Sequence, residues 1–211
     1  VVKELTTTTE PAIAVTSGVK TLTRRAGIKP NDITNAVRGA TTLVTNCLLE
    51  RSGDKTALIT TKGFRDILEI GKEWRYDIYD LFLKMPEPLV PRRLRKGVTE
   101  RIDHNGEIIQ VLDPSELENI VKFFKDENVR SIAICFLHAY KNPLHERKAR
   151  DMVLDLFPNS EVCISSEVIP EIREYERCST VVANAYVLPV ARKHFANLRR
   201  MLEETGVGGR T

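Results

Sequence analysis

One segment restricts the possible folds of this chain more than any other. The run Ser131–Leu137 contains Ile132, Ile134 and Phe136 and has no charged side chain. A nearly continuous apolar run of this length is typical of a parallel strand that is covered on both faces. Parallel strands need crossover connections, usually helices, and helical patterns flank this run. The sequence therefore predicts an α/β protein with a mixed sheet.

The helices of the second half have clear boundary signals. Asp113 precedes Pro114, and Glu116 is placed for a capping box, so a helix is expected to start at residue 114. Pro143 opens a second helix, and a third, long helix is expected near the C-terminus. Because Pro189 lies inside this third pattern, we expect it to kink or break the helix near residue 185.

The first half is less regular. A helix is expected from Pro11 to a terminating Gly27, and residues 74–91, rich in aromatics and proline, predict a long ordered loop. Asn105-Gly106 lies between two segments of alternating apolar and polar residues, which predicts a β-hairpin. We take this hairpin as the boundary between two lobes, 1–96 and 97–211. The other expected elements are strands at 1–7, 56–60 and 162–165, helices at 41–51 and 64–70, and an extended piece at 36–38.

Composition excludes some classes of protein. The net charge of +3 is weak, and the basic run at 92–96 has no interleaved aromatics for base stacking, so a solvated loop and no nucleic-acid partner are predicted. No stretch approaches the roughly 20 apolar residues that span a bilayer, and the first ten residues do not resemble a secretory signal. The four cysteines are widely spaced, as expected for reduced, buried thiols in a cytoplasmic protein.

Two turns before predicted helices are candidate binding sites. The exposed N–H groups and hydroxyls of Gly39-Ala40-Thr41-Thr42 fit a phosphate or a substrate carbonyl, but the same residues also fit a plain threonine N-cap. At the next turn, Arg65 fits a bidentate clamp on a carboxylate or phosphate. Its alternative is a surface ion pair with Asp66 or Glu69.

Two further clusters follow the most buried strand. His138, His145 and Glu146 flank its end, where open α/β sheets usually bind ligands, and two imidazoles with a carboxylate fit a divalent metal. The histidines are seven residues apart, which is not a standard ligand spacing, so the alternative is that Glu146 only favours a helix N-terminus. Glu174 and Arg177 precede the last helix. They are either structural charges that fix a loop or catalytic groups.

Six segments in register resemble the amino-terminal region of the hydantoinase/oxoprolinase family. The resemblance covers nearly the whole chain. The segments are 41–46 (TTLVTN), 60–71 (TTKGFRDILEIG), 88–92 (PLVPR), 100–103 (ERID), 137–146 (LHAYKNPLHE), and 173–180 (REYERCST) leading into 184–186 (NAY).

This resemblance implies a partial domain of the actin, sugar-kinase and heat-shock ATPase fold with a second lobe that contains the hairpin. It implies ATP-dependent opening of a small cyclic amide, with ATP and Mg²⁺ as cofactors, in a homo-oligomer or with a B-type partner subunit. The alternative activity is ATP-dependent ketone carboxylation. The implied catalytic residues are Glu174 and Arg177, and the implied phosphate- or substrate-binding residues are Gly39, Thr41, Thr42, Asn46, Arg65 and Asp66.

Two departures from the family pattern matter. The chain has no DxGGTFTD phosphate turn, so we expect an incomplete nucleotide-binding part that is inactive by itself and has an open sheet edge. The usual His-Gly-Thr-Thr is replaced by Arg38-Gly39-Ala40-Thr41-Thr42, which removes the histidine. This altered turn keeps open a second interpretation, a non-catalytic lobe that serves regulation or assembly.

Overall fold

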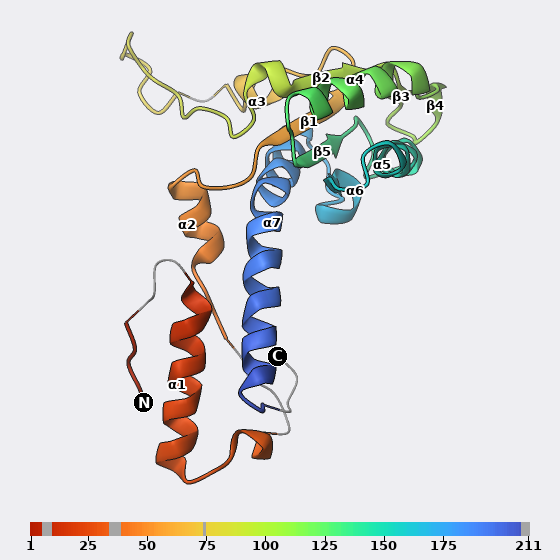
Figure 1. The fold of residues 1–211 in the computed structure, drawn as a ribbon. Helices are drawn as coiled ribbons and strands as arrows, with labels where there is room; N and C mark the ends of the chain where they lie inside the picture. The colour runs from red at the N-terminus through yellow and green to blue at the C-terminus, as the bar shows by residue number, and fades with distance from the viewer. Residues whose placement is uncertain (6–9, 34–38, 74, 208–211) are drawn as a thin grey trace. The chain divides into compact units, whose positions relative to one another are not determined.

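The computed structural model describes residues 1–5, 10–33, 39–73 and 75–207 (Figure 1). The chain divides into two compact units, one made of Val1–Asn46 with Val190–Thr211 and one made of Cys47–Pro189. This division differs from the expected boundary after residue 96, because strands from both sides of that boundary share one sheet.

The larger unit is built on a four-stranded parallel sheet. The order is β2-β1-β5-β6, from β1 (Thr56–Thr61), β2 (Arg95–Val98), β5 (Ser131–Cys135) and β6 (Glu161–Ile164). Every residue of β1 and β5 is buried, as the apolar pattern of the fifth strand predicted. The α/β class is therefore confirmed, whereas the antiparallel pairing forms a separate hairpin outside this sheet.

Helices complete the core of this unit. Helix α4 (Pro114–Asp126) contacts β2 and α5 (Leu144–Leu156), and α5 contacts β5 and β6. Asp113 caps α4 by accepting hydrogen bonds from the backbone N–H groups of Ser115 and Glu116, as predicted. The apolar side chains Leu117, Ile120, Val121 and Phe124 of α4 lie in the core, each contributing about 1.5–3 kcal/mol through burial.

Smaller elements lie around the sheet. The predicted hairpin is present as β3 (Arg101–Ile102) and β4 (Ile108–Gln110), and Gly106 in its turn has a φ of 92°. Only one helical turn, α3 (Ile67–Ile70), forms in the expected helix at 64–70. The one-turn helices η2 (Arg92–Leu94) and α6 (Ser165–Val168) precede β2 and follow β6.

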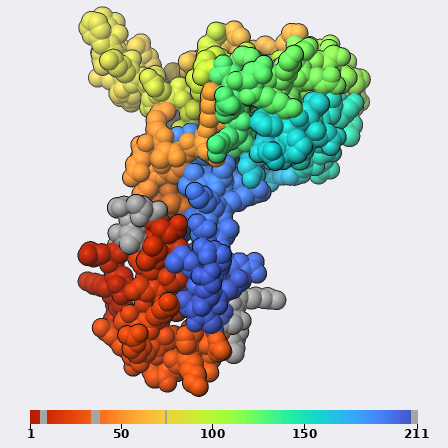
Figure 2. Space-filling model, viewed as in Figure 1, coloured from red at the N-terminus to blue at the C-terminus, as the bar shows by residue number. Residues whose placement is uncertain are grey.

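Residues 72–90 form the expected long loop over the part that the structure describes. The loop projects from its unit, in yellow in Figure 2, and its large apolar side chains are exposed. They include Tyr76, Ile78, Tyr79, Leu81 and Phe82.

The regular elements of the smaller unit are helices, as far as its described residues go. It contains α1 (Pro11–Ala26), the one-turn helix η1 (Pro30–Asp32), most of α2 (Leu43–Leu49) and the end of α7 (Glu174–Glu204). Helix α1 ends at Gly27, whose φ of 68° gives the left-handed cap that glycine favours, as predicted.

Two sequence predictions about the chain's ends are corrected. Residues 1–5 form no strand, because no neighbouring strand pairs with them among the described residues; the rest of that predicted strand, and the extended piece at 36–38, lie outside the described residues. Helix α7 continues through Pro189, so the predicted break does not occur, whereas the alternative of a kink stays a prediction. The boundary between the two units falls directly after this proline, where the helix lacks one backbone N–H donor.

Candidate functional site

The sheet topology marks one place where a ligand is expected. From β1 the chain goes to β2 on one side, and it then returns to place β5 on the other side of β1. The strand order therefore reverses between β1 and β5. In open parallel sheets, ligands bind outside the carboxyl ends of the strands at such a switch point.

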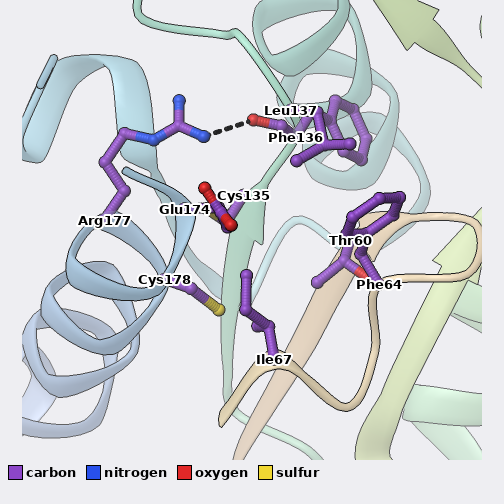
Figure 3. Close-up of a pocket in the computed structure, with 9 residues that line it drawn as sticks. All are labelled: Thr60, Phe64, Ile67, Cys135, Phe136, Leu137, Glu174, Arg177 and Cys178. Carbon is purple, nitrogen blue, oxygen red and sulfur yellow. Dashed lines mark hydrogen bonds between the residues drawn. The ribbon is translucent and has the colours of Figure 1, made fainter. Parts of the chain in front are cut away.

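A small pocket lies at this point (Figure 3). Its volume is about 10 Å³, which is roughly the space that one water molecule needs. The lining residues come from the ends of β1 and β5, the turn after β1, and the first turn of α7: Thr60, Phe64, Ile67, Cys135, Phe136, Leu137, Glu174, Arg177 and Cys178.

Both predicted catalytic residues line this pocket. Glu174 is exposed and is the first residue of α7, whereas Arg177, one helical turn later, is 1% exposed. The Nη2 of Arg177 donates a hydrogen bond of 2.9 Å to the backbone carbonyl of Phe136, just after β5. Its Cζ lies 5.3 Å from the centre of the Tyr140 ring, in cation–π contact.

The two cysteines of the pocket, Cys135 and Cys178, are buried free thiols. A hydrogen bond with Cys135 and burial raise the pKa of the Cys178 thiol well above its usual value. A raised thiol pKa disfavours the thiolate, which is the nucleophilic form of cysteine. The prediction of reduced buried thiols agrees with all four cysteines.

A buried polar network lies beside the pocket, at the same edge of the sheet. Thr61 at the end of β1 donates its hydroxyl hydrogen to Glu100, which follows β2, and accepts a hydrogen bond of 3.0 Å from the N–H of Leu137. The other carboxylate oxygen of Glu100 lies 2.8 Å from Nδ1 of His145. This network ties the ends of β1, β2 and β5 to the start of α5.

Glu146, the next residue of α5, makes a second connection. Its carboxylate accepts hydrogen bonds from the N–H of Phe136 at 2.9 Å, the hydroxyl of Ser165 at 2.6 Å and the N–H of Ser166 at 2.8 Å. Burial raises the pKa of Glu146, although these three hydrogen bonds act in the opposite direction. His145 and Glu146 thus fasten strand ends together.

The structure does not gather the three predicted metal ligands. His138 is half-buried, and its Nδ1 lies 3.5 Å from the hydroxyl of Tyr140, whereas His145 and Glu146 have the separate partners described above. Burial lowers the pKa of His138, and the charges of Arg101 and Arg177 lower it further. Over the described ranges, no group of three His, Cys, Asp or Glu side chains is placed to hold a metal ion.

The turn with Arg65 and Asp66 lies in the same unit. Arg92 binds Asp66 in a bidentate manner, with Nε–Oδ1 and Nη2–Oδ2 distances of 2.8 and 2.9 Å. This hydrogen bonding lowers the pKa of Asp66. Arg65 makes only a 3.7 Å ion pair with Asp66, and its side chain is half exposed. The basic run is largely neutralised as well, since Arg93 pairs with Glu127 and Arg95 with Glu69.

The other predicted binding residues belong to the smaller unit. Gly39, Thr41, Thr42 and Asn46 are exposed, and Arg38 lies outside the described residues. The hydroxyl of Thr41 accepts a 3.1 Å hydrogen bond from the N–H of Leu43, where α2 begins. This contact is the local cap that the sequence offered as the alternative to phosphate binding.

Sequence reasoning missed the central role of Glu100. The residue was noted only within its motif, and its partners are 39 and 45 residues away in the chain. A charged residue inside a segment of alternating apolar and polar residues was the available signal. A wider groove of about 600 Å³, between α3, the long loop and Tyr175, was also unforeseen.

Among the described helices, none combines the length and the apolar character that a membrane span requires.

The family model of the hydantoinase/oxoprolinase N-terminal region matches residues 1–157. A protein of unassigned function from Methanocaldococcus jannaschii is 43% identical over this whole chain, which covers 31% of that protein. Caprolactamase subunit alpha of Pseudomonas jessenii is 34% identical over 92% of the chain and 29% of its own length. The 5-oxoprolinase of Saccharomyces cerevisiae is 36% identical over 80% of the chain and 15% of its own length.

Solved structures agree with these relatives. The crystal structure of the ATP-dependent caprolactamase from Pseudomonas jessenii has a TM-score of 0.88 at 32% identity, covering 97% of this chain and 30% of that one. An acetone carboxylase structure has a TM-score of 0.84 at 24% identity, covering 95% of this chain and 30% of that one, and shows the shared fold. The chain thus spans about a third or less of the length of the proteins that it matches. It belongs to the hydantoinase/oxoprolinase family, whose N-terminal region residues 1–157 match.

Proposed function

We propose that this chain is part of an ATP-dependent hydrolase that opens cyclic amides. One observation carries the proposal: a caprolactamase described as ATP-dependent shares 32% identity and a TM-score of 0.88 with nearly the whole chain. The similarity to a 5-oxoprolinase points to the same class of substrate, a cyclic amide. We further propose that the protein acts as an oligomer or with a partner subunit, since one relative is named as a subunit. We also propose that it acts in the cytoplasm.

The chemistry assigned to this chain's residues is limited to the pocket at the switch point. When bound, ATP would supply a phosphoryl group that activates the amide oxygen. Arg177 would stabilise negative charge on an oxygen near the carboxyl end of β5. Glu174, which is exposed at the start of α7, would give or take a proton at the ring nitrogen or at the attacking water.

The described residues hold no group of three His, Cys, Asp or Glu side chains placed for a metal ion, and no step is assigned to Mg²⁺. Gly39, Thr42 and Asn46 remain the proposed contacts to a phosphate or substrate, with Thr41 already bonded to Leu43. Arg65 also remains a proposed contact, because among the described residues its guanidinium makes only one long ion pair, whereas Asp66 is held by Arg92.

The test is phosphate release from ATP by the full-length polypeptide, together with its partner subunit if one copurifies. We expect 5-oxoproline, caprolactam or hydantoin to stimulate release. Glu174→Gln and Arg177→Lys should each lower kcat by about 100-fold. Arg200→Gln is the matched control, because Arg200 lies on the same helix, exposed and paired with Glu204. Stimulation by acetone and bicarbonate alone would favour the carboxylase alternative, and no ATP binding would favour a non-catalytic lobe.

A further inference from the structure

Arg177 is a buried cation without a carboxylate partner among the described residues. Its side chain is 1% exposed, and only Nη2 has a hydrogen-bond acceptor, the carbonyl of Phe136. Nε and Nη1 are buried and have no partner in the described part of the chain. Glu174, one helical turn earlier, is exposed, and its carboxylate is not a hydrogen-bond partner of the Arg177 guanidinium.

This arrangement is unfavourable unless something else compensates the charge. A buried guanidinium loses its hydration, and the loss is recovered only by an anion or by a full set of acceptors. The Tyr140 ring at 5.3 Å supplies part of the compensation through its π face. The ring does not accept hydrogen bonds from the buried Nε and Nη1 donors as an anionic oxygen would.

The surroundings of Arg177 add positive charge. Burial has the largest effect in lowering the pKa of His138, and the charges of Arg101 and Arg177 lower it further. The charge of Asp103 acts in the opposite direction. Asp103 itself accepts hydrogen bonds from the N–H groups of Asn105 and Glu107. Arg101 and Arg177 are thus the cations that act on His138 at the end of β5, and Glu174 is the carboxylate that lines the same pocket.

The location suits a ligand. Arg177 lines the pocket between the carboxyl ends of β1 and β5, where the strand order reverses (Figure 3). The pocket volume of about 10 Å³ admits one oxygen-sized atom. A ligand would place a single oxygen there and keep its remaining atoms outside.

We propose that Arg177 is the anchor of an oxyanion site, which binds a carboxylate or phosphoryl oxygen of a ligand at the switch point of the sheet. The identity of the ligand rests on the proposed function, since opening a cyclic amide with ATP forms a carboxylate and inorganic phosphate. The site itself rests only on the geometry of Arg177, Phe136 and Tyr140.

The experiment is isothermal titration calorimetry of the full-length polypeptide with inorganic phosphate and, separately, with acetate, at constant ionic strength and without ATP. We expect one of the two anions to bind at one site per chain. Arg177→Gln should weaken binding at least tenfold, Arg177→Lys should weaken it less, and Arg200→Gln should leave it unchanged. Whichever anion binds identifies the source of the oxygen. No binding of either anion, or equal binding by the wild type and Arg177→Gln, would overturn the proposal.

A second measurement covers the case in which the Arg177 variants do not fold. In the wild type, the bound anion should slow amide hydrogen exchange in peptides that contain residues 136–140 and 174–178, and should leave residues 11–26 unchanged. Unchanged exchange at 136–140 and 174–178 would count against the site. Because no turnover is needed, anion binding without amide-stimulated ATP hydrolysis would contradict only the proposed function.

Discussion

His145 and Glu100 form a buried pair, with Nδ1 of the histidine 2.8 Å from a carboxylate oxygen of the glutamate. The two side chains are nearly inaccessible to solvent. Glu100 also accepts the hydroxyl hydrogen of Thr61, so one carboxylate joins the ends of two strands to a helix. The pair explains why this edge of the sheet is polar inside and still tightly packed.

Removing the Glu100 carboxylate should destabilise the fold. In Glu100→Ala, the buried hydroxyl of Thr61 and Nδ1 of His145 lose their partner, which should cost about 2–4 kcal/mol of unfolding free energy. Urea unfolding followed by circular dichroism measures this change. Glu118→Ala is the control, since Glu118 is exposed on α4 and its removal should change stability by less than about 0.5 kcal/mol. A loss of unfolding free energy equal to that of the control would mean that the network contributes little to stability.

Glu146 should give the protein a pH dependence of a definite sign. Burial raises the pKa of Glu146, so the folded state binds its proton more tightly than the unfolded state does. The associated stability is fully present below the unfolded pKa, near 4.5, and is lost as pH rises through the folded pKa. The unfolding free energy of the wild type, relative to Glu146→Gln, should therefore fall as pH rises from 4.5. Urea unfolding of both proteins across this range measures it, and a difference that grows with pH would contradict the assignment.

Gly53 should not tolerate a side chain. A Cβ atom at this position would collide with the Tyr186 ring and would lie 2.6 Å from the Tyr186 carbonyl oxygen. Gly53→Ala should lower the thermal midpoint, with a cost of about 1–3 kcal/mol from overpacking. At Gly39 a Cβ would meet nothing within 4 Å, so Gly39→Ala should leave stability unchanged or raise it by up to about 1 kcal/mol. Similar midpoints for the two variants would show that the contact with Tyr186 relaxes freely.

Pro189 should weaken the helix that contains it. Its ring nitrogen cannot donate to the carbonyl of Ala185, and Pro189→Ala restores that hydrogen bond, which should add about 1–3 kcal/mol to stability. Calorimetric melting measures the change. Pro170→Ala, exposed and outside the helices, serves as the control and should leave stability unchanged or slightly lower. A lower midpoint for Pro189→Ala would mean that the proline ring makes packing contacts worth more than the hydrogen bond.

Local signals predicted several elements correctly. The apolar run of β5, the Asp113 cap of α4, the Gly27 end of α1 and the turn at Gly106 all depend on residues close together in the chain. Strand β2 was missed because its residues, Arg95-Lys96-Gly97-Val98, look like a solvated basic loop. Arg95 is buried there, bonded to the carbonyl of Val90 and paired with Glu69, and Gly97 allows close approach to the Lys62 backbone.

The sequence by itself determined the α/β class and several helix ends, because hydrophobic periodicity, caps and turn residues act over a few residues. The resemblance to the family marked the segment that contains Glu174 and Arg177. Only the tertiary structure decided that Arg177 is buried beside Phe136 without a carboxylate, and that Glu100 joins Thr61 to His145. Such contacts join residues about 40 positions apart. Their energies depend on burial and on the full set of neighbours, which the sheet order sets and no local pattern encodes.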